Sequence, residues 1–301
     1  MMASLPRRNA PDVGGMSPEP RGPTVKRIVV GTQLRRLREA GGITRGAAGY
    51  TIRASEAKIS RMELGRVSFK ERDVADLLTL YGIHDGPDRT AFLNLVHQAN
   101  TPGWWQEYGD VLPSWFETYL GLEQAASMLR THEAQFVPGL LQTEDYARAV
   151  VRLGLPGTSD DEVQRRADLR LRRQAVLTQD GAPRVWVILD ETALRRPLGS
   201  REVLAAQLRH LLELSELPNV SIQVLLHESG GHAAVGGPFT LLRFADPDLP
   251  DIVYVEQLTS ALYLDKRQDT DRYAMVLSRL AVEAESPART AAIIHDLVHQ
   301  Q

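Results

Sequence analysis

The 301-residue chain has no cysteine. This absence excludes disulfides, thiol nucleophiles, and zinc or iron–sulfur sites with cysteine ligands, and it fits a reducing cytosol. The sequence also has no apolar run near the roughly 18 residues that a membrane span needs. Residues 1–23 contain proline and glycine but no apolar stretch, so we expect no secretory signal peptide. We therefore predict a cytoplasmic protein that does not contact a membrane.

The charge of the chain is unevenly distributed. Residues 1–100 hold 16 Lys and Arg against 10 Asp and Glu, a net charge of +6. Residues 101–301 hold 19 against 28, a net charge of −9, and together the two parts have the overall charge of −3. A basic head on an acidic body is typical of a head that meets a polyanion. Chance clustering of solvated charge is the alternative.

Composition and periodicity divide the chain into four parts. Residues 1–25 hold five prolines and three glycines and predict a disordered tail, because such a segment buries too little apolar surface to order itself. Helical periodicity predicts an all-α head of five helices over residues 26–100. Residues 101–118 form an aromatic linker, and residues 119–301 mix helical and strand patterns.

The aromatic residues of the linker have two interpretations. They are Trp104, Trp105, Tyr108, Trp115 and Tyr119. We favour a hinge that packs the two regions together, and the alternative is a platform for a ligand.

The region after the linker predicts an α/β domain. Four runs indicate buried strands, at residues 184–190, 220–226, 239–244 and 252–256. A helix over residues 201–216 separates the first two strands, which favours parallel pairing with a right-handed crossover, whereas the later strands favour an antiparallel meander. Further helices are predicted at about 120–130, 142–153, 160–179, 266–284 and 287–299. The fold class is thus α+β, with an all-α head and a four- to five-stranded mixed sheet.

The segment from residue 31 to 65 has the pattern of a helix-turn-helix. Two short helices must cross at a steep angle, with the second free to enter the major groove of DNA. Apolar residues with suitable spacing for this crossing are Leu34, Leu37, Ala48, Ile52 and Ile59. Ala48 and Gly49 are small where the helices must approach. The helix predicted over residues 55–64 exposes Glu56, Ala57, Ser60 and Arg61 on one side.

The runs LRRLREAGGIT and SEAKISRMELGR, within residues 28–83, resemble the Xre (Cro/cI-type) helix-turn-helix family of lambda-repressor-like fold. The resemblance implies that base edges are read by Glu56, Ala57, Ser60 and Arg61. It implies phosphate contacts from Arg45, Ser55, Lys58 and Arg66. It also implies a structural ion pair between Arg38 and Glu63.

The chemistry of these side chains suits the implied roles. Arg61 can bond guanine through two hydrogen bonds, Glu56 can accept from the cytosine amino group, and Ala57 can touch a thymine methyl. Lys58 and Arg66 would supply the salt-sensitive phosphate contribution.

One position departs from the family pattern. The turn between the two helices often carries glycine, which tolerates a left-handed backbone, and here Arg53 stands in its place.

A second set of short motifs runs through the rest of the chain. They are Trp104-Trp105, 119–123 (YLGLE), 137–150 (VPGLLQTEDYARAV), 172–174 (RRQ), 189–191 (LDE), Gln207-Leu208, 237–239 (GPF) and 253–256 (VYVE). With these motifs, most of the chain resembles the actinobacterial, Streptomyces-type regulators of the WhiJ family, in which an Xre head precedes a domain of unknown function. The resemblance implies a developmental or antibiotic-related regulator, whose gene often lies beside one for a small partner protein in an arrangement likened to antitoxin and toxin.

Two groups of residues allow a competing chemical interpretation. A zinc-binding HExxH motif needs its histidines four apart on one helix, but His227 and His232 are five apart in a glycine-rich run. We therefore favour a surface loop there, with a partner-binding loop or a hydrolase site as alternatives. Asp190-Glu191 could be paired carboxylates for acid–base work, although such a pair more often caps a helix. We expect no metal and no cofactor.

The sequence thus predicts a transcriptional regulator that binds double-stranded DNA and is not an enzyme. One recognition helix contacts too few base pairs for useful specificity, so we expect a homodimer on paired half-sites. Residues 119–301 would serve dimerisation and the sensing of a ligand or partner, and the protein would lie on the nucleoid. The alternative is an antitoxin-like protein that binds a small neighbouring-gene product, with DNA binding secondary.

Overall fold

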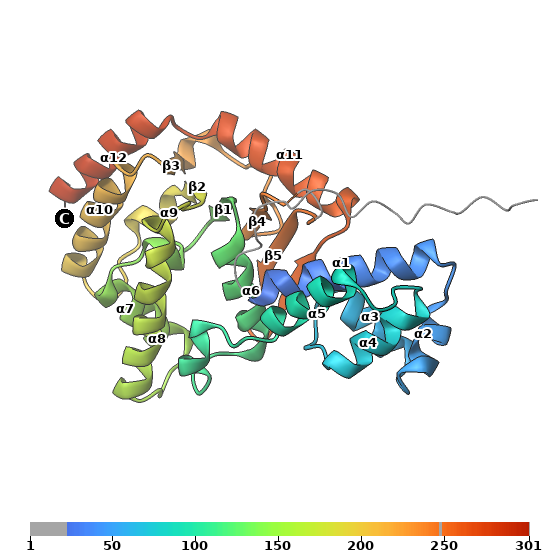
Figure 1. Ribbon diagram of the computed structural model, residues 1–301. Coiled ribbons are helices and arrows are strands. Elements are labelled where there is room, and N and C mark those ends of the chain that lie inside the picture. Colours follow the sequence, from blue (N-terminus) through green and yellow to red (C-terminus); the bar gives the residue numbers. More distant parts are fainter. Residues whose placement is uncertain (1–22, 247–248, 301) are drawn as a thin grey trace, which may run out of the picture.

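A computed structural model describes residues 23–246 and 249–300. Five helices form a head at one end of the molecule, and six strands with further helices form a body (Figure 1). The head comprises α1 (Pro23–Ala40), α2 (Arg45–Thr51), α3 (Glu56–Glu63), α4 (Glu71–Leu80) and α5 (Pro87–Ala99). The five-helix head is therefore as predicted.

The first helix begins earlier than the sequence pattern indicates. The predicted tail reaches residue 25, but α1 starts at Pro23, and Thr24 and Val25 are buried. Val25 and Val29 belong to the apolar core of the body. The tail prediction was wrong at this end because these side chains find their apolar partners far along the chain. The rest of the predicted tail, residues 1–22, lies outside the described residues.

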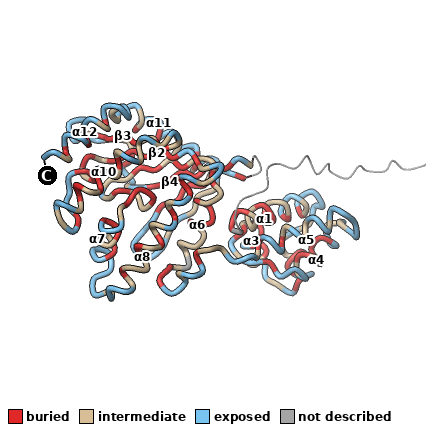
Figure 2. The backbone as a smooth tube through the Cα atoms, turned by 60° about the vertical axis from the view of Figure 1, so that its left-hand side comes forward, coloured by how far each residue is buried: buried red, intermediate tan, exposed pale blue. Residues whose placement is uncertain are grey.

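The head has its own apolar core, separate from that of the body. Each of the five helices contributes to it, and the helix-turn-helix residues expected to pack together all lie in or against this core. Figure 2 shows buried backbone on the inside of both head and body. The buried members of the head core are Val30, Leu34, Ala48, Ile52, Ile59, Met62, Phe69, Val74, Leu77, Leu78, Val96 and Ala99.

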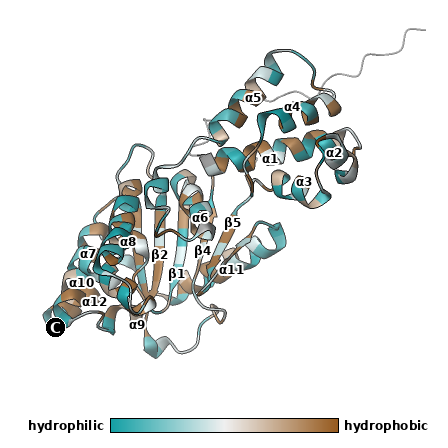
Figure 3. Cartoon of the chain, turned by 90° about the horizontal axis from the view of Figure 1, so that it is seen from below, coloured by the Kyte–Doolittle hydropathy of each residue, from teal (hydrophilic) through white to brown (hydrophobic). Residues whose placement is uncertain are grey.

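Helix α6 (Ser114–Ala125) connects the head to the body. It follows a short 3-10 helix, η1 (Trp104–Tyr108), and packs against α1. The predicted boundary between linker and body, at residue 118, falls inside α6. Figure 3 shows the head beyond the β5 side of the sheet, away from α10 and α12.

The sheet of the body has the strand order β3-β2-β1-β4-β5-β6. Strands β1, β2 and β3 pair in parallel, and β4, β5 and β6 follow as an antiparallel meander joined to β1. The bounds are β1 (Met128–Glu133), β2 (Arg184–Asp190), β3 (Val220–Leu225), β4 (Phe239–Arg243), β5 (Ile252–Glu256) and β6 (Ala261–Leu264). The four predicted strands and the parallel and antiparallel pairings are confirmed.

Two strands were not predicted, so the described sheet has six strands instead of four to five. β1 lies where a helix over residues 120–130 was expected to end, and its sequence MLRTHE has only two apolar residues. β6 is four residues long and follows β5 after a short turn. β1 lacks the apolar content by which a buried strand is recognised, and β6 is only as long as the shortest recognisable apolar run.

Helices cover both faces of the sheet, which is why β2 is apolar on both sides. One face packs against α6, α7 (Glu144–Gly154), α10 (Arg201–Ser215) and α12 (Pro287–Gln300). The other packs against α11 (Arg267–Glu283). Two further helices, α8 (Asp160–Arg173) and α9 (Glu191–Arg195), lie beside α7 and after β2. No helix of the described residues has both the length and the apolar content to cross a membrane.

Candidate functional site

The recognition helix α3 begins at a polar cap. Ser55 accepts a hydrogen bond at its side-chain oxygen from the Lys58 backbone N–H at 3.2 Å, and Thr44 caps α2 in the same way through Ala47 at 3.1 Å. Each cap satisfies a backbone donor that the first helical turn leaves unpaired. The two caps therefore define where α2 and α3 start.

Glycines set the angle between the helices of the head. A Cβ on Gly49 of α2 would lie 2.6 Å from the carbonyl oxygen of Ala54, and Ala48 beside it is fully buried. A Cβ on Gly31 of α1 would lie 2.7 Å from the carbonyl oxygen of Glu63, so only glycine lets α1 reach the end of α3. Gly65 ends α3 with φ +65°, a left-handed conformation that favours glycine.

Arg38 and Glu63, the predicted ion pair, lie in direct contact and are both buried. A second contact joins Arg38 Nη2 to Glu63 Oε2 at 3.2 Å, and Arg38 also donates to the Ile43 carbonyl at 2.9 Å. The hydrogen bond to Glu63 raises the pKa of Arg38 above its usual value. The pair joins α1 to the end of α3 and so holds the recognition helix in its orientation.

Arg53 adopts the left-handed conformation that the turn requires, with φ +53°. Among the described residues it is the one non-glycine with a positive φ. Its backbone N–H donates to the Tyr50 carbonyl at 3.2 Å, and Ala54 N–H donates to Gly49 at 2.8 Å. The turn geometry of the motif is therefore retained without glycine.

The residues predicted to read bases lie on the outer side of α3. Glu56, Ala57 and Arg61 are exposed, and Ser60 is partly exposed. Ile59 and Met62, on the opposite side, are buried in the head core. A Cβ on Gly46 would lie 2.7 Å from Glu56 Oε1, so this carboxylate rests over the first turn of α2.

The residues predicted to contact phosphates differ in whether their side chains already form ion pairs within the protein. Arg66 is exposed, whereas Lys58 forms an ion pair with Asp73 of α4 at 2.7 Å. Arg45 donates to Glu63 at 3.0 Å and therefore shares the carboxylate of the Arg38–Glu63 pair. Within residues 23–246 and 249–300, no ion pair engages Arg61 or Arg66.

Two exposed side chains near α3, those of Tyr50 and Arg53, were not among the residues predicted to contact DNA. Tyr50 is 88% exposed, and it surrounds a shallow depression together with Thr51, Arg53 and Ala54. Arg53 is exposed and, in the described part of the chain, has no ion-pair partner. Its position in the turn immediately before α3 was the available indication that its side chain lies on the outer side of the motif. The exposed groups beside α3 thus include Arg53, Arg61 and Arg66, all of one sign.

The aromatic linker divides between two places. The guanidinium of Arg172 in α8 lies 4.9 Å from the ring centre of Trp104, and Arg165 lies 5.4 Å from that of Tyr108. Trp105 is buried against Leu169 of the same helix. These contacts hold the first part of the linker on the body. Trp115 and Tyr119, by contrast, line a cavity of the body.

The loop with His227 and His232 meets the ends of β1 and β2. His227 Nε2 lies 2.9 Å from Thr192 Oγ1, and His232 Nε2 lies 3.9 Å from Asp190 Oδ2. Asp190 caps α9 by accepting from Thr192 N–H at 2.8 Å. In the part of the chain that the structure describes, no group of three or more histidine and carboxylate side chains has the geometry to hold a metal.

Buried His132 lies beside this loop, with its ring centre 5.1 Å from that of His232. Burial lowers the pKa of His132 below its usual value. Its Nδ1 lies 3.1 Å from the Ile188 carbonyl oxygen. Glu191 is equally engaged, because it accepts from His227 N–H at 2.8 Å. The polar groups of this cluster thus bond mainly to the backbone.

The head, with its exposed third helix, defines the class of helix-turn-helix DNA-binding regulators. A helix-turn-helix domain model matches residues 29–92. The model of a domain of unknown function, DUF5753, matches residues 116–296, more than half of the chain, and the chain belongs to this family. The comparison with curated proteins returned no match, and neither did the comparison with solved structures.

Proposed function

We propose that the protein is a cytoplasmic transcriptional regulator of the Xre type that reads one DNA sequence through α3. The observation that carries this proposal is the outward face of α3, where Glu56, Ala57 and Arg61 are exposed. Arginine and glutamate can each discriminate base edges in the major groove, and an alanine methyl can touch thymine. Arg53 and Arg66 at the two ends of α3 are placed to contact phosphates on either side of the groove.

The test is a binding titration with duplexes selected from genomic DNA by the full chain. We expect Arg61→Ala to weaken binding to the selected duplex by about 1–3 kcal/mol and to relax the base preference at one position of the duplex, as for an arginine that contacts guanine. Arg279→Ala is the matched control, because Arg279 is exposed on α11, in the body. Equal affinities of wild type and Arg61→Ala for every duplex would contradict the proposal.

We further propose that the regulator acts as a homodimer and that its body senses a ligand or a partner. One α3 covers few base pairs, so two copies on paired half-sites supply the specificity. Light scattering in solution tests this: a dimer has twice the 33.4 kDa of one chain. A monomer at the concentrations that saturate DNA would contradict the dimer.

The antitoxin-like alternative has one supporting observation. Leu258 and Leu262, beside and on the edge strand β6, are exposed apolar side chains. An open sheet edge with apolar side chains is a surface on which another chain can add a strand. Co-purification with the product of the adjacent gene, lost in Leu262→Lys, would favour this alternative over a regulator that works alone.

The proposed regulator has no catalytic step. The carboxylates of Asp190 and Glu191 are bonded to backbone N–H groups of Thr192 and His227, which supports a structural role for them. We expect His232→Ala to leave DNA affinity unchanged, and we expect the purified chain to contain no stoichiometric zinc. Bound zinc that His232→Ala removes would support the hydrolase interpretation instead.

A further inference from the structure

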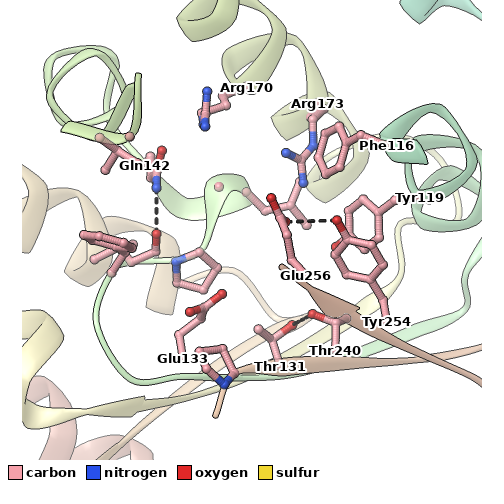
Figure 4. A pocket seen from close by; sticks show the side chains of 18 of the residues that line it. Phe116, Tyr119, Thr131, Glu133, Gln142, Arg170, Arg173, Thr240, Tyr254 and Glu256 are labelled. Atoms are coloured by element: carbon pink, nitrogen blue, oxygen red, sulfur yellow. Dashed lines mark hydrogen bonds between the residues drawn. The ribbon is translucent and has the colours of Figure 1, made fainter. Parts of the chain in front are cut away.

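A cavity of about 620 Å³ lies in the body between the sheet, α6 and α8. Its floor is one face of β1, β4 and β5, its roof is α8, and the aromatic residues of α6 form one side (Figure 4). Sites of 300–1,000 Å³ hold small organic ligands. The cavity is therefore within the size range of sites that hold drug-sized molecules.

The floor of the cavity is polar where a covered sheet face is normally apolar. On the same face, β2 carries Val185 and Val187, but β1 carries Thr131 and Glu133, and β4 carries Thr240. The two threonine hydroxyls lie 3.1 Å apart and bond each other. Because strand side chains alternate between faces, these polar residues point away from the α11 side of the sheet and into the cavity.

One side of the cavity is an aromatic wall. The rings of Phe116 and Tyr119 stack with centres 5.2 Å apart, and Tyr119 lies 4.3 Å from Tyr254 of β5. The Tyr254 hydroxyl donates to Glu256 at 2.9 Å. The guanidinium of Arg173 lies 5.1 and 5.5 Å from the ring centres of Phe116 and Tyr119, and the rest of the wall offers aromatic surface against which a ring system can pack.

Two of the three arginines of the cavity are neutralised by nearby carboxylates. Arg173 forms a buried bidentate pair with Glu123, at 2.9 and 2.7 Å, and Arg166 pairs with Glu162 at 2.8 Å. Arg170 differs, because within the described residues it pairs with no carboxylate and donates instead to the carbonyl of Arg166, at 3.2 Å. Burial lowers the pKa of Arg170 to about 10 against the opposing charge of the Glu256 carboxylate, which lines the same cavity, and Arg170 stays charged at neutral pH.

A carboxyl group, that of Glu133, and an amide oxygen, that of Gln142, line the same cavity. Glu133 lies on the opposite side of the cavity from Arg170 in Figure 4. Burial, assisted by Glu256, raises the pKa of Glu133 to about 8, so it is mostly uncharged at pH 7. Gln142 donates to the Val137 carbonyl at 2.7 Å, but its buried Oε1 has no hydrogen-bond partner among the described residues.

We propose that this cavity binds a small organic anion with a flat apolar body, whose anionic group pairs with Arg170 and whose hydrogen-bond donor reaches Gln142 Oε1. The aromatic wall packs against the body of the ligand. Two carboxyl groups line the cavity: Glu133, whose raised pKa keeps it mostly uncharged near neutral pH, and Glu256, which accepts a hydrogen bond from Tyr254. The inference rests on the sensing role proposed for the body and names the ligand class that this role requires.

The test uses two fluorescent probes on the full chain without DNA. 8-Anilinonaphthalene-1-sulfonate has an anionic group, an N–H donor and aromatic rings, and N-phenyl-1-naphthylamine has the same rings and N–H without the sulfonate. We expect saturable binding of the sulfonate probe at one molecule per chain. Arg170→Met should weaken it about tenfold, a change of about 1.4 kcal/mol, while the uncharged probe changes less than twofold.

The control variant is Arg279→Met, an exposed arginine of α11 outside the cavity, and it should bind both probes as wild type does. A second variant, Glu133→Gln, provides an independent test if Arg170→Met does not fold.

In wild type the affinity for the sulfonate probe should fall as the pH rises through about 8, where Glu133 acquires its charge. Glu133→Gln should remove this fall.

Three results would overturn the inference. The first is that the sulfonate probe does not bind saturably. The second is that wild type and Arg170→Met bind the sulfonate probe with equal affinity. The third is that Arg170→Met loses affinity for both probes to the same extent. If the chain binds its selected duplex but neither probe, the proposed function as a regulator stands and the ligand inference is wrong. If it binds the sulfonate probe through Arg170 but binds no duplex, the ligand inference stands and the proposed function is wrong.

Discussion

Gly121 of α6 touches Thr24 of α1, and a side chain at position 121 would overlap the threonine. This contact joins the head to the body. α6 carries Phe116 and Tyr119 on the cavity wall, and α1 carries Gly31 and Arg38 against α3. One helix pair therefore links the cavity to the recognition helix.

Gly121→Ala should destabilise this joint. Inserting a methyl group into a packed contact costs about 1–3 kcal/mol. Chemical denaturation should show a lower free energy of unfolding, and proteolysis within residues 101–113 should become faster. The control is Gly154→Ala, because a Cβ there would meet no heavy atom within 4 Å. An unchanged free energy of unfolding in Gly121→Ala would show that α1 and α6 can move apart at position 121 without loss of stability.

Arg38→Met should be among the most damaging substitutions in the head. Removing one partner leaves the charge of buried Glu63 with only Arg45, and breaking a buried pair costs about 3–5 kcal/mol. Arg35→Met is the matched control, since Arg35 forms an exposed pair with Glu39 that is worth less than about 1 kcal/mol. Thermal unfolding followed by circular dichroism measures both. Equal losses would argue against a special role for the Arg38–Glu63 pair.

The turn before α3 should tolerate glycine and reject a branched residue. Arg53 is held at φ +53°, and a left-handed backbone costs about 1–2 kcal/mol for an ordinary L-residue. Arg53→Val adds branching at Cβ and should lower the melting temperature, whereas Arg53→Gly should not. If Arg53→Val melted at or above the wild-type temperature, the turn geometry described here would be wrong.

Lys58 and Arg66 should differ in their effect on DNA binding. Arg66→Met should reduce the salt dependence of affinity by about one phosphate contact, a slope change of about 1. Lys58 is paired with Asp73, so Lys58→Met should change the slope less and lower stability instead. Affinity titrations between 50 and 200 mM salt, roughly the range in which phosphate contacts are lost, separate the two. A larger slope change for Lys58→Met would mean that the pair opens on DNA.

Glu133 should make stability depend on pH. Its folded pKa of about 8 is above its ordinary value, so the folded state holds the proton more tightly than the unfolded state. Stability is therefore highest well below pH 8 and falls as the pH rises through the folded pKa. Between pH 6.5 and 8.5, roughly the window around that pKa, the wild type should lose stability relative to Glu133→Gln. The control Glu228→Gln, at an exposed carboxyl, should follow the wild type.

The fold was predictable where local pattern and tertiary contact agree. β2, with the sequence RVWVILD, is apolar on both faces, and α3 begins at a capping serine. β1 was missed because Thr131 and Glu133 face a cavity, and no short-range pattern distinguishes such a strand from a loop. The start of α1 was missed because Val25 packs against the body.

The amino-acid sequence by itself determined the helix-turn-helix, since its caps, its small residues and its exposed side chains all lie within residues 31–66 and follow a local helical spacing. Only the tertiary structure decided which of the cationic residues form ion pairs. Lys58 pairs with Asp73 and Arg45 pairs with Glu63, and each pair joins two helices whose contact the helical pattern does not predict. The cavity is likewise a product of packing, because Arg170, Gln142 and Glu133 come from different segments that converge only when α8 closes over the sheet.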